Sequence, residues 1–209
     1  MNKIPQEVNN IIFDLGGVLL HIDAQRSIKA FESLGLTNAI NHGGWGYQHE
    51  VFLQMEKGLL SDEQFRNGIR ELLPEPASDE AIDKAWCAMI IDFSDDRINL
   101  LHELKKSYKL YLFSNTNNIH LNHFQTLFQQ RFGFPISDLF ENDYYSHVLN
   151  QRKPSVESFQ TVLNHAGLNP QETLFIDDSK ENTLGAEKAG MHAVHLTMEQ
   201  NLQALFGRN

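Results

Sequence analysis

Four short runs of apolar residues lie along the chain, and each is bounded by small, polar or acidic residues. They are VNNIIF, which ends at Phe13, KLYLF at 109–113, TLFI at 173–176, and HAVHL after Gly190. Brief runs of this kind, rich in branched and aromatic side chains, are typical of strands buried on both faces. The pattern therefore predicts four strands of a parallel sheet.

Segments with apolar residues at helical spacing separate these runs. One segment begins near Pro154, which is predicted to occupy the first helical position, and ends at Gly167. A second follows Ser179, a suitable N-cap, and a third covers INLLHELKKS at 98–107. Strands that alternate with helices of this length predict an α/β fold with a doubly wound, Rossmann-like parallel sheet.

The stretch from 23 to 96 is far too long for an ordinary connection between a strand and a helix. It carries helical periodicity instead, interrupted at NHGGWG and LPEPASD. The apolar positions that define this periodicity are Ile28, Phe31, Leu34, Val51, Phe52, Met55, Leu59, Phe65, Ile69, Leu72, Ile82, Trp86 and Met89. We expect a helical cap domain at 23–96, inserted into a core domain formed by 1–22 and 97–209, that opens and closes over a site as lids do.

The amino-acid composition argues against several classes of protein. The chain has 17 Lys and Arg against 27 Asp and Glu, a net charge of −10, which disfavours nucleic-acid and anionic-membrane surfaces. No run approaches the roughly 18 apolar residues of a membrane-spanning helix. The single cysteine, Cys87, excludes an intramolecular disulfide and a Cys-rich zinc site, and we expect it to be buried on a helix. A cytoplasmic protein with a small-molecule partner is the expectation.

Polar clusters follow the predicted strands. They are Asp14, Ser114–Asn115–Thr116, Lys153 and the pair Asp177 and Asp178. Ligands of open α/β sheets bind at the carboxyl ends of the strands, where these clusters fall. Carboxylates suit Mg²⁺, a lysine and a hydroxyl suit phosphate oxygens, and Asp14 is a plausible nucleophile.

Each cluster alone has an ordinary structural explanation. An acid after a strand often caps a helix, a Ser-Asn-Thr run often forms a turn, and paired aspartates are usually exposed. Their shared position at strand ends, in this order, favours a common site.

The four polar clusters, in this order along the chain, belong to motifs that resemble those of a known family. FDLGGVL at 13–19, LFSNTN at 112–117, RKP at 152–154 and FIDDSKEN at 175–182 cover almost the whole chain. With these motifs the chain resembles the haloacid dehalogenase-like phosphohydrolase superfamily, and the insertion matches the position and size of that superfamily's small cap. Within it, the chain is similar to bacterial sugar phosphatases of the α-D-glucose-1-phosphatase type, which share a glycine two residues after the nucleophile and a cap stretch like HEVFLQMEKGLLSDEQF.

The resemblance implies a role for each matching position. Asp14 would attack phosphorus in line and form an aspartyl-phosphate. Ser114 and the backbone N–H of Asn115 would hold phosphate oxygens, and Lys153 would neutralise the nucleophile and the transferring group. Fixed positive charge is also a physical need, because a carboxylate and a phosphate dianion repel each other.

The resemblance also implies a Mg²⁺ site. Asp14 and Asp178 would bind the ion directly, Asp177 would bind it through a water, and the main-chain carbonyl of Gly16 would be a further ligand. The implied activity is a phosphatase, a phosphoric monoester hydrolase, that acts on a small phosphorylated metabolite such as a sugar phosphate.

Gly16 departs from the family pattern. Most phosphatases of the superfamily have an aspartate there that protonates the leaving oxygen, and general acid–base help is typically worth about 10²–10⁴ in rate. An anomeric, aryl or acyl phosphate, whose leaving group is more acidic, would need less help. His21 and Asp23 are candidate substitutes, but we favour a solvated turn residue and a helix cap respectively.

Other polar residues have two open interpretations. Trp45 and Tyr47 either line a cap pocket or pack beneath a loop. Glu56 and Lys57 either face substrate or form a solvated face. His120, with His123 one helical turn later, is interpreted as a polar residue at the surface or rim.

Three other functions compete with the phosphatase. A non-catalytic protein that binds a phosphorylated ligand or a protein partner is favoured by Gly16, but the remaining motif residues are all present. Hydrolysis of a carbon–halogen bond is disfavoured by Asp177 and Asp178, because that chemistry needs no Mg²⁺. A phosphomutase would also need acid–base help at residue 16.

Overall fold

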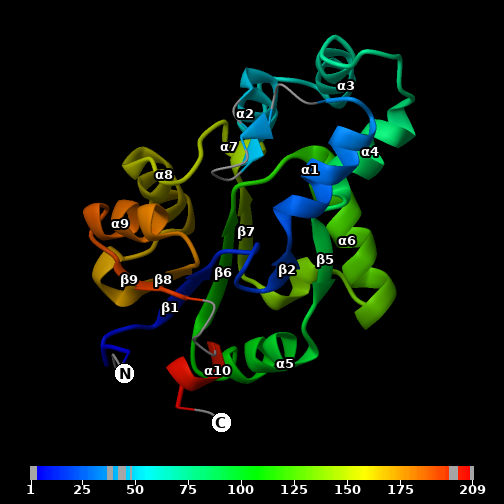
Figure 1. Ribbon diagram of the computed structural model, residues 1–209. Helices are drawn as coiled ribbons and strands as arrows, with labels where there is room; N and C mark the ends of the chain where they lie inside the picture. Colours follow the sequence, from blue (N-terminus) through cyan, green and yellow to red (C-terminus); the bar gives the residue numbers. More distant parts are fainter. Residues whose placement is uncertain (1–3, 37–39, 42–45, 48, 198–201, 208–209) are drawn as a thin grey trace.

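A five-stranded, fully parallel sheet organises the chain in this computed structural model, which describes residues 4–36, 40–41, 46–47, 49–197 and 202–207. The strand order is β7-β6-β1-β8-β9 (Figure 1). The strands are β1 (Asn10–Phe13), β6 (Lys109–Ser114), β7 (Asn142–Tyr145), β8 (Thr173–Asp177) and β9 (His192–His195). The predicted α/β fold with a parallel sheet is confirmed, and the four predicted strands are all present.

Helices cover both faces of the sheet. Ile11 and Phe13 of β1 pack with α5 (Asp95–Leu104) and α6 (Asn118–Phe132) on one face. Ile12 points to the opposite face, where α8 (Val156–Ala166) and α9 (Lys180–Lys188) lie. Successive side chains of a strand alternate between faces, so a strand buried on both sides must be apolar throughout.

The three predicted helices are present, but two of them begin elsewhere than predicted. The helix predicted at 98–107 is α5, which spans Asp95–Leu104. Ser155, not Pro154, is the residue that begins α8: its side chain accepts a hydrogen bond from the Ser158 N–H, and Pro154 precedes the helix. Gly167 ends α8 with φ +65°, and Ser179 caps α9 as predicted. The remaining short helices are α7 (Ser146–Leu149), α10 (Leu202–Leu205) and the 3₁₀ turns η1 (Ile136–Leu139) and η2 (Pro170–Glu172).

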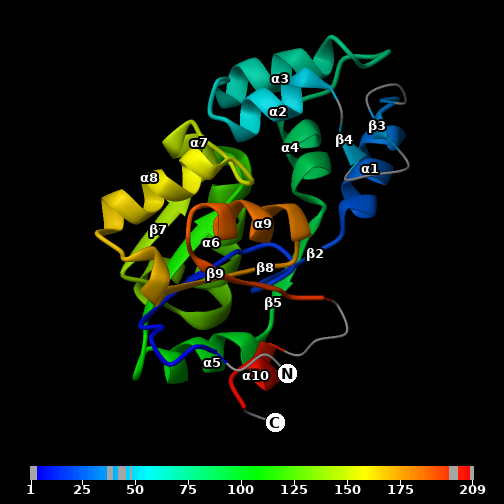
Figure 2. The same cartoon turned by 90° about the vertical axis from the view of Figure 1, so that its left-hand side faces the viewer.

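Four helices form a separate cluster, here called the helical unit, above one end of the sheet (Figures 1 and 2). They are α1 (Ala24–Ser33), α2 (Glu50–Glu56), α3 (Asp62–Arg70) and α4 (Asp79–Cys87). Phe31, Phe52, Phe65 and Trp86 pack ring against ring in its interior, which also contains the buried Cys87. Leu59, expected on the apolar face, is 60% exposed. A two-residue ladder pairs β3 (Ile40–Asn41) with β4 (Gly46–Tyr47).

Two short strands join the helical unit to the sheet. β2 (Leu20–Ile22) leads into α1, β5 (Ile90–Phe93) leads out of α4, and the two pair antiparallel. The entry and exit of the helical unit are therefore tied together beside the end of β1. Within the described part of the chain, no helix has both the length and the apolar character to cross a membrane.

Candidate active site

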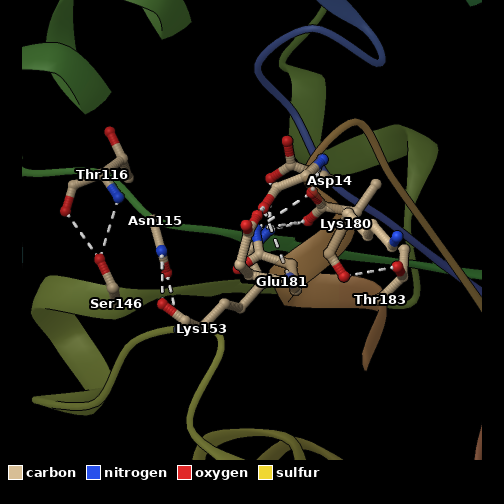
Figure 3. Close-up of polar contacts among 11 residues, drawn as sticks. Asp14, Asn115, Thr116, Ser146, Lys153, Lys180, Glu181 and Thr183 are labelled. Carbon is tan, nitrogen blue, oxygen red and sulfur yellow. Dashed lines mark hydrogen bonds and ion pairs between the residues drawn. The ribbon is translucent and has the colours of Figure 1, made fainter. Parts of the chain in front are cut away.

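The residues predicted for a site converge at the carboxyl ends of three neighbouring strands. Asp14 directly follows β1, and Ser114 ends β6. Asp177 ends β8 and Asp178 comes next. Lys153 arrives from the loop before α8 and reaches the same place (Figure 3). Parallel pairing of β1 with both β6 and β8 produces this convergence, because their carboxyl ends share one edge.

Lys153 is the charged centre of the site. Its side chain is 1% exposed, and Nζ lies 2.5 Å from Asp14 Oδ1 and 2.7 Å from Asp177 Oδ2. The rings of Phe113 and Phe175 lie 5.4 and 5.2 Å from Nζ and line the space around it. The ammonium can stay charged in this buried place because two carboxylates compensate its charge.

Asn115 fixes the segment that carries this lysine. Its amide Nδ2 donates to the carbonyl of Lys153, and its Oδ1 accepts from the N–H of Lys153, both at 3.0 Å (Figure 3). The side chain of Asn115 thus clamps both polar groups of one backbone residue. The sequence predicts only a backbone role for Asn115, so this function of its side chain is a new finding.

Asp177 is fully buried and held by the chain itself. Its Oδ1 accepts the N–H of Ser179 at 2.8 Å, and the amide of Asn182 reaches both carboxylate oxygens at 3.0 Å. With Lys153 as a further donor, most of its acceptor positions are occupied. Asp177 therefore orients the site, whereas Asp14 and Asp178 keep more of their oxygens available. Asn182 was not predicted as part of the site.

Burial and crowding oppose ionisation of the acids. Burial raises the pKa of Asp14 to about 7, against the charge of Lys153 and with a contribution from Asp177. Burial and the neighbouring Asp177 raise the pKa of Asp178 to about 6. Burial would lower the pKa of Lys153, but the charges of Asp14 and Asp177 outweigh it, so this pKa is raised. The ammonium of Lys153 therefore stays charged, and the neighbouring acids share its single positive charge.

The acids fit a divalent cation. One carboxylate oxygen from each of Asp14, Asp177 and Asp178 lies within 4.8 Å of the others. Three carboxylates face a single ammonium, so full ionisation leaves net negative charge that a bound cation would offset. Hard oxygen donors of this kind are the ligands that Mg²⁺ prefers.

The loop after β6 is anchored to the helical unit through Ser146. The Thr116 N–H donates to Ser146 Oγ at 2.9 Å (Figure 3). The same hydroxyl donates to the carbonyl of Glu56 in α2 at 2.7 Å. Ser146 is completely buried. It links the segment that follows Ser114 to α2, and no pattern in the sequence indicated it.

The end of α2 docks on the same part of the core. Glu56 Oε2 lies 3.0 Å from Nη2 of Arg152, the residue before Lys153, and the carbonyl of Lys57 accepts from Asn150 at 3.0 Å. Burial raises the pKa of Glu56, with the opposing charge of Arg152 reducing the effect. Glu56 is therefore an ion-pair partner at the junction and not part of a solvated face. Trp45 and the side chain of Tyr47 lie outside the described residues.

The sequence predictions for Asp23, His21 and His120 can each be compared with the structure. Asp23 caps α1, accepting the N–H of Gln25 at 3.0 Å, as favoured from the sequence. His21 is exposed on β2, where burial, and then Arg97, lower its pKa. His120 was interpreted as a surface or rim residue, and this is wrong: it is 8% exposed and its ring stacks on Trp86 at 4.4 Å.

Comparison with known proteins agrees with this geometry. The family described as haloacid dehalogenase-like hydrolase matches residues 8–190. The chain is 31% identical to D-ribitol-5-phosphate phosphatase from Bacteroides thetaiotaomicron over 84% of its own length and 85% of the relative. It is 28% identical to a sesquiterpene phosphatase from Aspergillus oryzae, over 89% of its length and 88% of the relative.

Solved structures show the same architecture. A HAD family enzyme from Bacteroides thetaiotaomicron, crystallised as a magnesium complex, superposes with a TM-score of 0.88 at 36% identity, covering 96% of this chain and 99% of that one. The same enzyme with magnesium and inorganic phosphate gives a TM-score of 0.86 at 36% identity, with coverages of 95% and 99%.

Proposed function

The chain belongs to the haloacid dehalogenase-like hydrolase family, and from that premise we propose that it is a Mg²⁺-dependent phosphatase that forms an aspartyl-phosphate on Asp14. The observation that carries this proposal is the buried bridge from Lys153 to Asp14 and Asp177, with a carboxylate oxygen of Asp178 within 4.8 Å of oxygens of both aspartates. A carboxylate held against an ammonium at the open end of a sheet suits attack on a phosphate ester.

The proposed reaction has two steps. A carboxylate oxygen of Asp14 attacks phosphorus, the bond from phosphorus to the ester oxygen breaks, and the leaving oxygen takes a proton from water to depart as the alcohol. Water then attacks the phosphorus of the aspartyl-phosphate, which releases inorganic phosphate and regenerates Asp14. Lys153 offsets the charge of the attacking carboxylate and of the phosphoryl oxygens, and Ser114 with the N–H of Asn115 orients those oxygens.

Asp14, Asp178 and the carbonyl of Gly16 would hold Mg²⁺, with Asp177 as an indirect ligand. When bound, the ion supplies positive charge to the phosphate and reduces the repulsion between the two anions. The contribution of the chain is to keep Asp14 and Asp178 together despite their raised pKa values.

We propose sugar and sugar-alcohol phosphates as the substrate class, supported by the relative named D-ribitol-5-phosphate phosphatase. We also propose that residues 23–96 form a cap over a core of 1–22 and 97–209. The junction of Glu56 with Arg152, next to Lys153, supports a cap that borders the site.

Phosphate release from a panel of sugar phosphates, sugar-alcohol phosphates and p-nitrophenyl phosphate, with and without Mg²⁺, tests the proposal. We expect turnover that requires Mg²⁺ and is lost in Asp14→Asn. Tight binding of a phosphate ester without turnover would instead support a non-catalytic binder, and halide release from a 2-haloacid, assayed alongside without Mg²⁺, would support dehalogenation.

A further inference from the structure

Arg97 donates a hydrogen bond to the loop that follows β1. It lies in the first turn of α5, directly after β5, the strand that leaves the helical unit. Its Nη1 donates to the carbonyl of Gly17 at 3.1 Å, and the residue is half-buried. An arginine of the exit strand's helix therefore holds the loop that begins with Asp14.

Gly17 is in direct contact with the carboxylate of Asp178. Its φ is +76°, and a Cβ added to it would lie 2.1 Å from Asp178 Oδ2. Any side chain at this position would collide with that carboxylate, so only glycine allows the approach. The position of Gly17 consequently determines where Asp178 can lie.

Both peptide groups that flank the Gly17 Cα are fixed by hydrogen bonds. The N–H of Gly17 donates to the carbonyl of Leu20 at 2.9 Å, and the carbonyl of Gly17 accepts from Arg97. The peptide unit is planar and trans, so the first bond also fixes the direction of the Gly16 carbonyl, which shares that plane. Arg97 fixes the second plane and so completes the orientation of the loop.

We propose that Arg97 is a positioning residue of the metal site, which it maintains by holding Gly17 against Asp178. This inference rests on the proposed function, since it concerns the same Mg²⁺ ligands, Asp178 and the Gly16 carbonyl. Two effects of the arginine oppose each other. Its hydrogen bond orders the loop and favours the ion, whereas its positive charge near Asp178 repels the ion.

The hydrogen bond is the stronger effect. Arg97 is half-buried, so water and salt still screen its charge, whereas the hydrogen bond acts directly on the loop. Removal of Arg97 should therefore weaken Mg²⁺ binding, although it removes a positive charge.

Calorimetric titration of the full-length protein with Mg²⁺, without substrate, tests this. We expect Arg97→Met to raise the Kd for Mg²⁺ by about 10-fold, and Arg97→Lys, which keeps a donor and the charge, to recover most of the loss. The matched control is Arg131→Met, which removes an arginine bonded to Asp92 and Asp95 around the same exit strand. This control should leave the Kd unchanged.

The outcomes separate the inference from the proposed function. A Kd in Arg97→Met equal to or lower than that of the wild type, measured on protein whose melting curve remains cooperative, overturns the positioning role alone. An equal rise in the Arg131→Met control overturns it as well, because the effect would then be general to the exit strand. Absence of Mg²⁺ binding in the wild type, or full binding in Asp178→Asn, overturns both proposals.

Discussion

Ile22 occupies the space in front of Gly16: a Cβ built on Gly16 would lie 3.1 Å from Ile22 Cδ1. Most phosphatases of the superfamily that the chain resembles have an aspartate at this position, although the sugar phosphatases most similar to it share the glycine. Here the acid is absent and an apolar side chain fills the neighbouring space. Gly16 has no positive φ, so its backbone would accept another residue and the obstacle to an acid is Ile22 itself.

Substitution of both residues should install the missing acid. Gly16→Asp alone is expected to gain little, because the new side chain meets Ile22. Gly16→Asp combined with Ile22→Ala should raise kcat/KM on alkyl phosphates by about 10²-fold, the lower end of the range of about 10²–10⁴ typical of general acid–base catalysis. The measurement is kcat/KM on a sugar-alcohol phosphate and on p-nitrophenyl phosphate, whose good leaving group needs no acid.

The single variant Ile22→Ala is the control, because it opens the space without adding an acid. Wild-type protein that hydrolyses alkyl phosphates as fast as p-nitrophenyl phosphate would contradict the idea that an acid is missing at residue 16.

Lys153→Met should affect both activity and stability. The change leaves Asp14 and Asp177 buried without their cation, and breaking a buried ion pair from one side costs about 3–5 kcal/mol. We expect that loss in the free energy of unfolding without added metal, measured by urea denaturation, and a fall in kcat of at least about 10².

A double-mutant cycle that combines Lys153→Met with Asp14→Asn measures the interaction free energy between these two residues. Neutralising Asp14 removes one of the two uncompensated charges, so the double variant should be less destabilised than the sum of the single variants. Strict additivity would show that Lys153 and Asp14 do not interact in solution as they do in the structure.

β1, β6 and β8 were predictable because their burial on both faces requires a nearly continuous run of apolar residues. β7 was missed because its sequence, NDYY, begins with two polar residues. The pairing of β2 with β5 was missed for a different reason: LHI and IIDF are short, and nothing local indicates that segments 70 residues apart will meet.

The charged residues of the site could be predicted from the sequence. Strand ends must converge in a parallel sheet, so Asp14 and Asp178 could be placed near each other from sequence. The orienting contacts of Asn115, Asn182 and Ser146 could not, because such residues are equally common in turns and caps. His120 was misinterpreted because its partner, Trp86, lies on a distant helix.

Ser146→Ala should loosen the loop after β6. Without the hydroxyl, the Thr116 N–H loses its acceptor and the Glu56 carbonyl loses its donor in a buried place. Leaving a buried polar group unpaired costs about 1–3 kcal/mol. We expect that decrease in the free energy of unfolding, together with a lower kcat/KM, because this loop follows Ser114.

Ser33→Ala is the matched control for Ser146→Ala. Ser33 is exposed on α1 and its hydroxyl donates to the Lys29 carbonyl one turn earlier, so its loss should change stability by less than about 0.5 kcal/mol. Equal effects of the two alanine variants would remove the special role assigned to Ser146.

His120 should make stability depend on pH at the contact between α4 and α6. Burial lowers the pKa of His120 from 6.5 to about 4, against a hydrogen bond from Nε2 to the Trp86 carbonyl at 3.0 Å. The unfolded chain therefore binds a proton in this range that the folded chain does not. The stabilising contribution is complete above pH 6.5 and is lost as pH falls towards 4.

The test is the free energy of unfolding of wild type and His120→Gln between pH 4.5 and 7.5. Glutamine keeps an N–H donor for the Trp86 carbonyl but does not titrate. The wild-type curve should fall more steeply below pH 6.5, with an excess slope of up to about 1.4 kcal/mol per pH unit for one proton. Parallel curves for the two proteins would mean that the folded state protonates His120 as readily as the unfolded chain does, which its burial against Trp86 does not allow.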